Sequence, residues 1–90
     1  MRLSAAILAT HGSHARWINA VPVRERSKGL PVWSGEVDVF ELVKHPTAKY
    51  CYAWAHDVKE GSEIIMVLKV PPVDSPQAAV REVLTSGKMH

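Results

Sequence analysis

The stretch KYCYAWAH, residues 49–56, has the most regular side-chain pattern in this 90-residue chain. Successive side chains of a β-strand point to opposite faces. One face of this strand would be broad and would carry Tyr50, Tyr52, Trp54 and His56. The other face would be small and would carry Cys51, Ala53 and Ala55. The pattern predicts a strand between two different layers, in which a helix approaches the small face and the aromatic face needs another cover.

Two further strands are predicted around this one. Residues 32–43 alternate apolar and polar side chains from Trp33 to Val39, and Phe40 and Leu42 then reverse the phase. A strand can change phase only at a bulge or bend, or where both faces are covered, so we expect a bulge near Val39 and Phe40. Residues 63–70 are apolar on both faces, which is typical of a central strand.

A C-terminal helix is predicted after Pro71 and Pro72, which end the third strand. Ser75 is the expected N-cap, Pro76 suits the first helical position, and Gly87 suits the C′ position. An apolar stripe would face the sheet and is formed by Ala79, Val80, Val83 and Leu84. The predicted fold is α+β, with three antiparallel strands followed by a helix in residues 32–90.

Residues 1–31 are predicted to form a basic, partly flexible arm. They carry five lysines and arginines against Glu25 alone, a net charge of +4, whereas residues 32–90 carry six basic and eight acidic residues, a net charge of −2. Pro22 confines any strand here to a sheet edge. Residues 1–15 could form a short helix, but an unsupported helix of that length is marginal, so we expect a frayed tail.

Size and cysteine usage narrow the class of protein. A folded unit of about 56 residues is marginal by itself and gains stability from its arm or from a second copy. Cys51 is the single cysteine, which excludes an internal disulfide and favours the cytoplasm. No apolar run reaches the length of a membrane span. Residues 1–9 are a short, diluted match to a signal peptide, so secretion is the less favoured alternative.

Two resemblances follow from these motifs. WSGEVDVF (33–40), HP (45–46), CYAW (51–54) and PPVDSPQAAVR (71–81) resemble a family of small uncharacterised bacterial proteins with no known activity. This resemblance covers about residues 33–84 and implies no mechanism. The predicted strand order is similar to that of the plant-type AP2 DNA-binding domain and integrase arm-binding domains, which read DNA with basic and aromatic residues on the open sheet face. Glu36, Asp38 and the net acidic domain depart from that pattern.

Catalytic and metal-binding signatures are weak. Cys51 with His45 or His56 and Asp57 has the residue types of a nucleophilic triad, but nothing in the spacing brings these residues together. His11 and His14 could share a helical face as metal ligands, but no third ligand follows at a diagnostic spacing. Gly35 and Gly61 are isolated and form no phosphate loop. We therefore expect no enzyme and no cofactor, and a buried, structural Cys51.

The leading hypothesis is a small module that acts through self-association, as a homodimer, or through contact with another protein. Aromatic residues are enriched in interface cores, and the candidate interface consists of Trp33, Tyr50, Tyr52 and Trp54. The alternative is nucleic-acid binding, with bases stacked on Tyr52 or Trp54. Its phosphate contacts would be Arg16, Arg24, Arg26 and Lys28.

Overall fold

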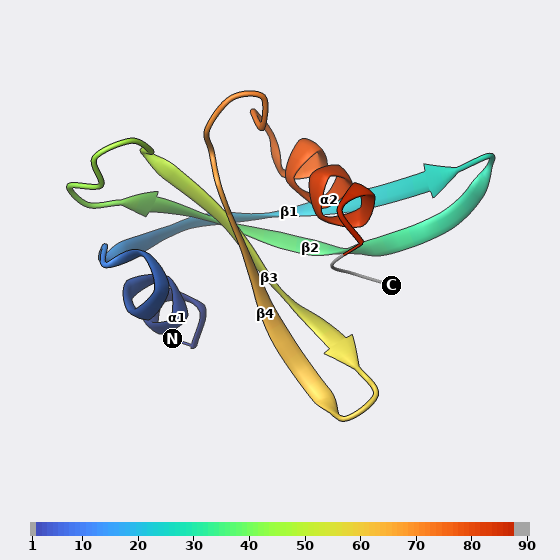
Figure 1. Ribbon diagram of the computed structural model, residues 1–90, viewed down its shortest axis with the longest axis horizontal. Coiled ribbons are helices and arrows are strands. Elements are labelled where there is room, and N and C mark those ends of the chain that lie inside the picture. Colours follow the sequence, from blue (N-terminus) through green and yellow to red (C-terminus); the bar gives the residue numbers. More distant parts are fainter. Residues whose placement is uncertain (1, 88–90) are drawn as a thin grey trace.

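The computed structural model describes residues 2–87, in which an antiparallel sheet has one helix on each face (Figure 1). The strands lie in chain order β1-β2-β3-β4, and each is antiparallel to the next. The elements are α1 (Arg2–His11), β1 (Ala15–Ser27), β2 (Leu30–Leu42), β3 (Tyr50–Val58), β4 (Gly61–Leu68) and α2 (Pro76–Thr85).

The sheet has four strands, so the prediction of three strands and an irregular arm is wrong. The additional strand, β1, comes from the expected arm and pairs along its length with β2. Pro22 lies in the middle of β1 and lacks an amide hydrogen, which a strand with only one neighbour tolerates. The polar, irregular composition of β1 is typical of an edge strand. A linker has the same composition, so the sequence alone did not distinguish the two.

The phase change of β2 has one of the two expected causes, which is cover on both faces. Val37 and Val39 belong to the core under α2, whereas Phe40 and Leu42 belong to the core under α1, so both faces of β2 are covered. A register shift lies between Trp17 and Asn19 of β1, opposite Phe40 and Val39. The extra residue of this bulge is in β1, so the prediction of a bulge in β2 near Val39 and Phe40 is wrong.

Helix α2 begins and ends as its capping residues predict. The side chain of Ser75 accepts a hydrogen bond from the backbone N–H of Ala78 at 3.1 Å, and Pro76 occupies the first turn. Gly87 has a φ of 75°, which is the left-handed conformation expected just after a helix. These local signals act within a few residues and do not depend on the rest of the fold.

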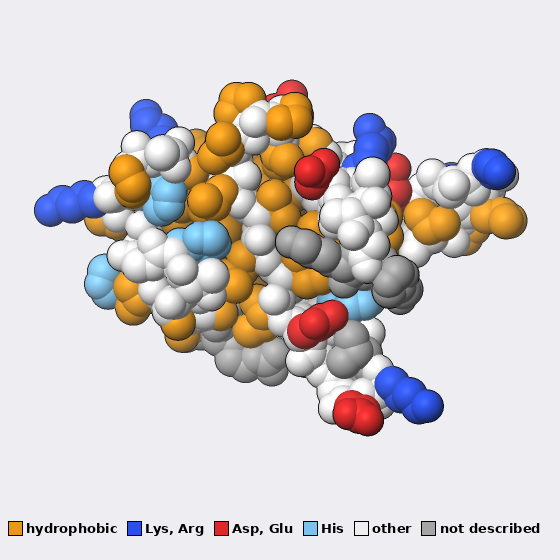
Figure 2. Space-filling model, in the orientation of Figure 1, with side chains coloured by type: hydrophobic (Ala, Val, Ile, Leu, Met, Phe, Trp, Pro, Cys, Tyr) orange, Lys and Arg blue, Asp and Glu red, His pale blue; other side chains and the backbone are white. Residues whose placement is uncertain are grey.

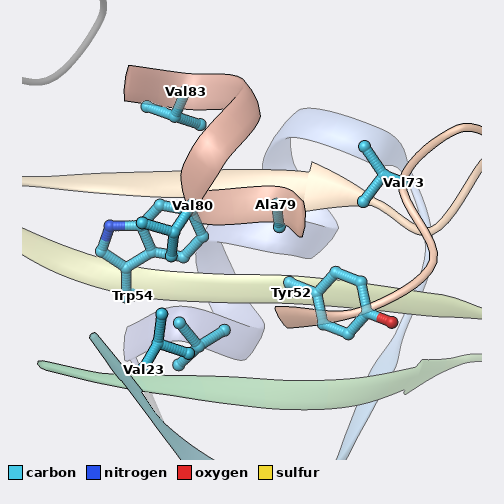
Figure 3. Packing of buried hydrophobic residues seen from close by; sticks show 8 residues of the cluster. Val23, Tyr52, Trp54, Val73, Ala79, Val80 and Val83 are labelled. Atoms are coloured by element: carbon cyan, nitrogen blue, oxygen red, sulfur yellow. The ribbon is translucent and has the colours of Figure 1, made fainter. Parts of the chain in front are cut away.

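Helix α2 lies on the opposite face of the sheet from the one predicted. Figure 3 shows α2 over the aromatic face, where Ala79 and Val80 pack against Tyr52 and Trp54. The prediction placed α2 on the small face because alanines allow a close approach. Here the helix supplies a small side chain, Ala79, so it can approach a face with large ones.

Helix α1 covers the small face of β3, so the expectation of a frayed tail is wrong. The side chain of Ile7 is fully buried, in a core that also contains Phe40, Cys51 and Ala53. The small side chains of Cys51 and Ala53 leave space above the sheet, and Ile7 occupies it. Tertiary packing of this kind is what stabilises a ten-residue helix in water.

The two β-hairpins share only a short central region and then diverge (Figure 1). Strands β2 and β3 pair only between residues 38–41 and 50–53. Beyond that region, Trp33 of β2 and Trp54 of β3 pack together, with ring centroids 5.9 Å apart. This arrangement leaves β4 at an outer edge, so the prediction that it is a central strand is wrong.

Candidate functional site

The predicted aromatic interface lies largely inside the molecule. Tyr52 and Trp54 are 4% and 1% exposed, and Trp33 is partly buried against Trp54. Tyr50 is partly buried at the end of the row, with Nζ of Lys69 5.3 Å from its ring centroid. Helix α2 therefore provides the cover that we expected from a partner, and these four residues do not form one exposed surface.

The four basic residues lie along β1 and its turn and remain exposed. Arg16 forms an ion pair with Glu41, and Arg26 Nη1 donates a hydrogen bond to the carbonyl oxygen of Gly29 at 3.2 Å. Arg24 lies between them in β1, and Lys28 lies in the turn with a φ of 53°. The structure does not bring these cations together with an exposed face of Tyr52 or Trp54.

Two residues of the possible nucleophilic triad, Cys51 and His45, are engaged elsewhere. Cys51 is fully buried, and its Sγ donates to the carbonyl oxygen of Tyr52 at 3.7 Å. Burial raises the pKa of the Cys51 thiol to about 11, so it is protonated at neutral pH, whereas the thiolate is the nucleophile. Nδ1 of His45 accepts hydrogen bonds from the backbone N–H groups of Thr47 and Ala48. These contacts assign Cys51 and His45 structural roles.

The predicted pairing of His11 with His14 does not occur on a helix. Helix α1 ends at His11, and Gly12 has a φ of 69°, so His14 lies beyond the helix. The ring of His11 instead meets the edge of the His45 ring, with centroids 6.3 Å apart. Within residues 2–87, no group of three or more His, Cys, Asp or Glu side chains is placed to hold a metal ion.

Neither described helix is long and apolar enough to cross a membrane, since α1 and α2 have ten residues each.

The outer edge of β4 is the most unusual surface of the sheet. Its apolar segment, Ile64–Leu68, contains no proline and no charged residue. All five of its side chains are partly buried: those of Met66 and Leu68 contact the core under α1, and those of Ile65 and Val67 contact the core under α2. A strand with this composition is normally well covered on both faces, whereas these side chains are only partly buried, and within residues 2–87 β4 has a neighbouring strand on one side only.

Backbone geometry shows which groups of β4 point outward. The backbone N–H of Lys69 donates to the carbonyl oxygen of Tyr50 at 2.9 Å, so Lys69 directs its polar groups toward β3. Because this direction alternates along an antiparallel ladder, the N–H and C=O groups of Ile64, Met66 and Leu68 point away from β3. In agreement, the carbonyl oxygen of Leu68 accepts from Val70, just beyond the strand.

The opposite edge of the sheet, β1, is protected against further pairing. It contains Pro22, charged side chains at Arg16, Arg24 and Arg26, and a bulge between Trp17 and Asn19. Prolines, charges and bulges are the devices by which proteins prevent unwanted strand addition. Residues 64–68 of β4 have none of them, so the two edges of one sheet differ in their capacity to accept a strand.

Two hollows border the β4 edge. One, of about 400 Å³, is lined by residues 65–68 and Val70, by Glu82 and Val83 of α2, and by the C-cap residue Ser86. The other, of about 350 Å³, is lined by residues 63–66. Figure 2 shows hydrophobic side chains along the middle of this face, between the positions of α1 and α2 in Figure 1. The β4 edge is thus bordered by two mainly apolar hollows, one of which lies beside α2.

A third hollow, of about 360 Å³, lies between the end of the β1–β2 hairpin and α2. Its lining includes Glu25 and Arg81, which form an ion pair with 3.0 Å between Oε1 and Nε. Gln77 also donates to the Glu25 carboxylate. The charged groups of this hollow bind one another and so join α2 to β1, which is a structural role. We therefore take the β4 edge as the candidate binding surface.

The sequence pattern indicated that residues 64–68 are apolar on both faces, but it did not show that they form an edge. The sequence signal that bears on it is Pro71 and Pro72, which end β4, followed by a helix up to residue 85, because none of these residues can add a strand beside β4.

Comparison with known proteins adds no relative. No family model matches the chain, and no curated protein and no solved structure matches it.

Proposed function

We propose that the protein is a non-enzymatic interaction module that binds an extended segment of polypeptide along the outer edge of β4. In this mode of recognition, the added segment becomes a further strand of the sheet. Backbone hydrogen bonds supply affinity, and side chains of the segment would enter the hollows that border the edge.

One observation carries this proposal: within residues 2–87, β4 is an edge strand whose apolar side chains are only partly buried on both faces. Ile64, Met66 and Leu68 direct unpaired strand groups outward from an apolar segment, with the exception of the Leu68 carbonyl, which Val70 binds. An added strand would pair these groups and complete the burial of side chains that are only partly covered. Exposed edges of this kind are costly unless they are used, because they promote aggregation.

Nucleic-acid binding, the alternative from the sequence, receives less support. It requires clustered cations and an exposed stacking face. Arg16 is neutralised by Glu41, and α2 covers Tyr52 and Trp54. The proposed function therefore uses the β4 edge rather than β1.

The test is a titration of ¹⁵N-labelled full-length protein with a synthetic peptide of the sequence of residues 62–69, followed by NMR. We expect the amide resonances of Ile64, Met66 and Leu68 to shift together and their hydrogen exchange to slow. Ile64→Pro should abolish the shifts, because it removes an outward N–H and places a ring where the added strand would lie. Ile64→Thr retains the N–H and a β-branched side chain, so it should still bind the peptide.

Both variants are first checked for native folding by circular dichroism. Shifts confined to other surfaces, or peptide binding that Ile64→Pro leaves intact, would refute strand addition at β4. A parallel titration with a single-stranded oligonucleotide at low salt tests the alternative, and binding there with none at β4 would favour it.

A further inference from the structure

The charges that flank the β4 edge are arranged symmetrically. Glu63 precedes the apolar segment and Lys69 follows it, and each lies three residues from Met66. Both side chains are exposed. Because their separation is an even number of residues, both are expected on the same face of the strand, the α2 face of Ile65 and Val67.

This arrangement is self-complementary under a two-fold rotation. If β4 pairs antiparallel with another β4 about Met66, Glu63 of each copy lies opposite Lys69 of the other. Ile64 then lies opposite Leu68, Ile65 opposite Val67, and Met66 opposite itself. The register thus places opposite charges at both ends of a continuous apolar centre.

The backbone allows the same register. The outward-pointing groups belong to Ile64, Met66 and Leu68, and rotation about Met66 maps this set onto itself. Each outward group therefore meets an outward group of the second copy. The backbone N–H and C=O groups of Glu63, Ile65, Val67 and Lys69 point to β3. In this register these residues lie opposite one another, and they keep their hydrogen bonds to β3 of their own copy.

We propose that the segment bound along β4 is the β4 strand of a second copy of this chain, antiparallel and centred on Met66. This inference rests on the proposed function and names its partner. The two sheets would join into one, and each α2 would lie on the same face. The hollow of about 400 Å³ beside α2 would receive side chains of the second copy. Such an interface is isologous, as in most homodimers.

The test is sedimentation equilibrium of full-length protein between about 5 and 500 µM, the range suited to a small interface. We expect a monomer–dimer equilibrium. Glu63→Lys and Lys69→Glu should each weaken dimerisation about tenfold, because two pairs of opposite charges per dimer become like charges. The double variant Glu63→Lys/Lys69→Glu should restore it. Glu60→Lys makes the same charge change in the exposed turn and should alter the dimer constant less than about twofold.

The outcomes separate this inference from the function on which it rests. A protein that stays monomeric while the peptide still shifts the β4 amides would refute self-pairing and leave strand addition intact. Dimerisation that Ile64→Pro abolishes but the charge swaps do not change would refute the register centred on Met66. Dimerisation insensitive to both would refute the use of β4 altogether.

Discussion

At the scale of single residues, Gly35 controls the packing of two tryptophans. A methyl group at this position would lie 2.9 Å from Cη2 of Trp33, because the indole ring of Trp33 lies across the glycine. The same ring packs against Trp54, the largest fully buried side chain of the core. The absence of a side chain at Gly35 therefore lets β2 contribute to the core where the hairpins diverge.

Gly35→Ala should displace the Trp33 ring from Trp54. We expect a loss of about 1 kcal/mol in the free energy of unfolding, the usual worth of an aromatic pair or a mild steric conflict. Urea denaturation and near-ultraviolet circular dichroism measure these effects. Ser34→Ala, at the exposed neighbouring position, is the control and should change neither. An unaltered tryptophan spectrum in Gly35→Ala would contradict the role of this glycine.

Cys51 should react slowly with alkylating reagents in the folded protein. Its thiol is fully buried, and burial raises its pKa to about 11. We therefore expect iodoacetamide to modify native protein at pH 8 at least about a hundredfold more slowly than protein unfolded in guanidinium chloride. Above the pKa of the unfolded thiol, rising pH should also favour unfolding, because the folded state retains the proton. Rapid modification of native protein would show that Cys51 is accessible.

At the scale of elements, α1 is stabilised by one buried contact rather than by its own sequence. It has no acidic residue in its first turn, and Ile7 is its fully buried side chain. The helix also has an exposed leucine at the next position, Leu8. Adjacent residues of similar size thus provide a direct comparison of buried and exposed contacts.

Ile7→Ala should lower the free energy of unfolding by about 2–4 kcal/mol, because it removes apolar atoms and leaves a cavity above Cys51 and Ala53. Leu8→Ala should cost less than about 1 kcal/mol, since Leu8 is 39% exposed. Urea denaturation of both variants measures the difference. Equal losses would mean that α1 does not cover the sheet through Ile7.

At the scale of the whole molecule, a polar cluster fastens α2 to the β1–β2 hairpin. Glu25 of β1 pairs with Arg81 of α2, and Gln77 donates both to Glu25 and to the carbonyl oxygen of Arg24. The hydrogen bond from Arg81 is the main reason that the pKa of Glu25 lies below its ordinary value, and burial opposes it. This cluster fixes the hairpin relative to the helix where β2 and β3 no longer pair.

Acid should weaken this connection. A carboxylate with a lowered pKa stabilises the fold above its ordinary pKa, and that contribution is lost as the pH falls from the ordinary pKa through the lower folded-state pKa. Glu25→Gln should therefore lose less stability than the wild type between about pH 6 and 3, by up to about 1 kcal/mol. Urea denaturation at about pH 6 and at about pH 3 measures these free energies of unfolding. The control variant Glu60→Gln, at an exposed position, should lose as much stability as the wild type between the two pH values. Identical acid sensitivity in Glu25→Gln would contradict this account.

Local chemistry was sufficient to predict three of the four strands and α2. Alternation along residues 49–56, the N-cap at Ser75 and the C′ residue Gly87 each act over a few residues, so their effects can be predicted without knowledge of distant contacts. From the sequence, the β4 edge could be recognised only as an apolar stretch. Residues 64–68 show that they need apolar neighbours, but not from which chain those neighbours come.

The sequence by itself determined that this chain is α+β, where β2, β3, β4 and α2 lie, and that both faces of the sheet require a cover. Only the tertiary structure decided that Ala15–Ser27 is a fourth strand, that α1 covers the small face and α2 the aromatic face, and that β4 is an edge. Small side chains occur on both sides, at Ala53 in the sheet and at Ala79 in α2, so composition allowed either pairing of helix with face. The choice depends on long-range packing: Ile7 fits above Cys51 and Ala53, which leaves the aromatic face to α2 and the β4 edge open.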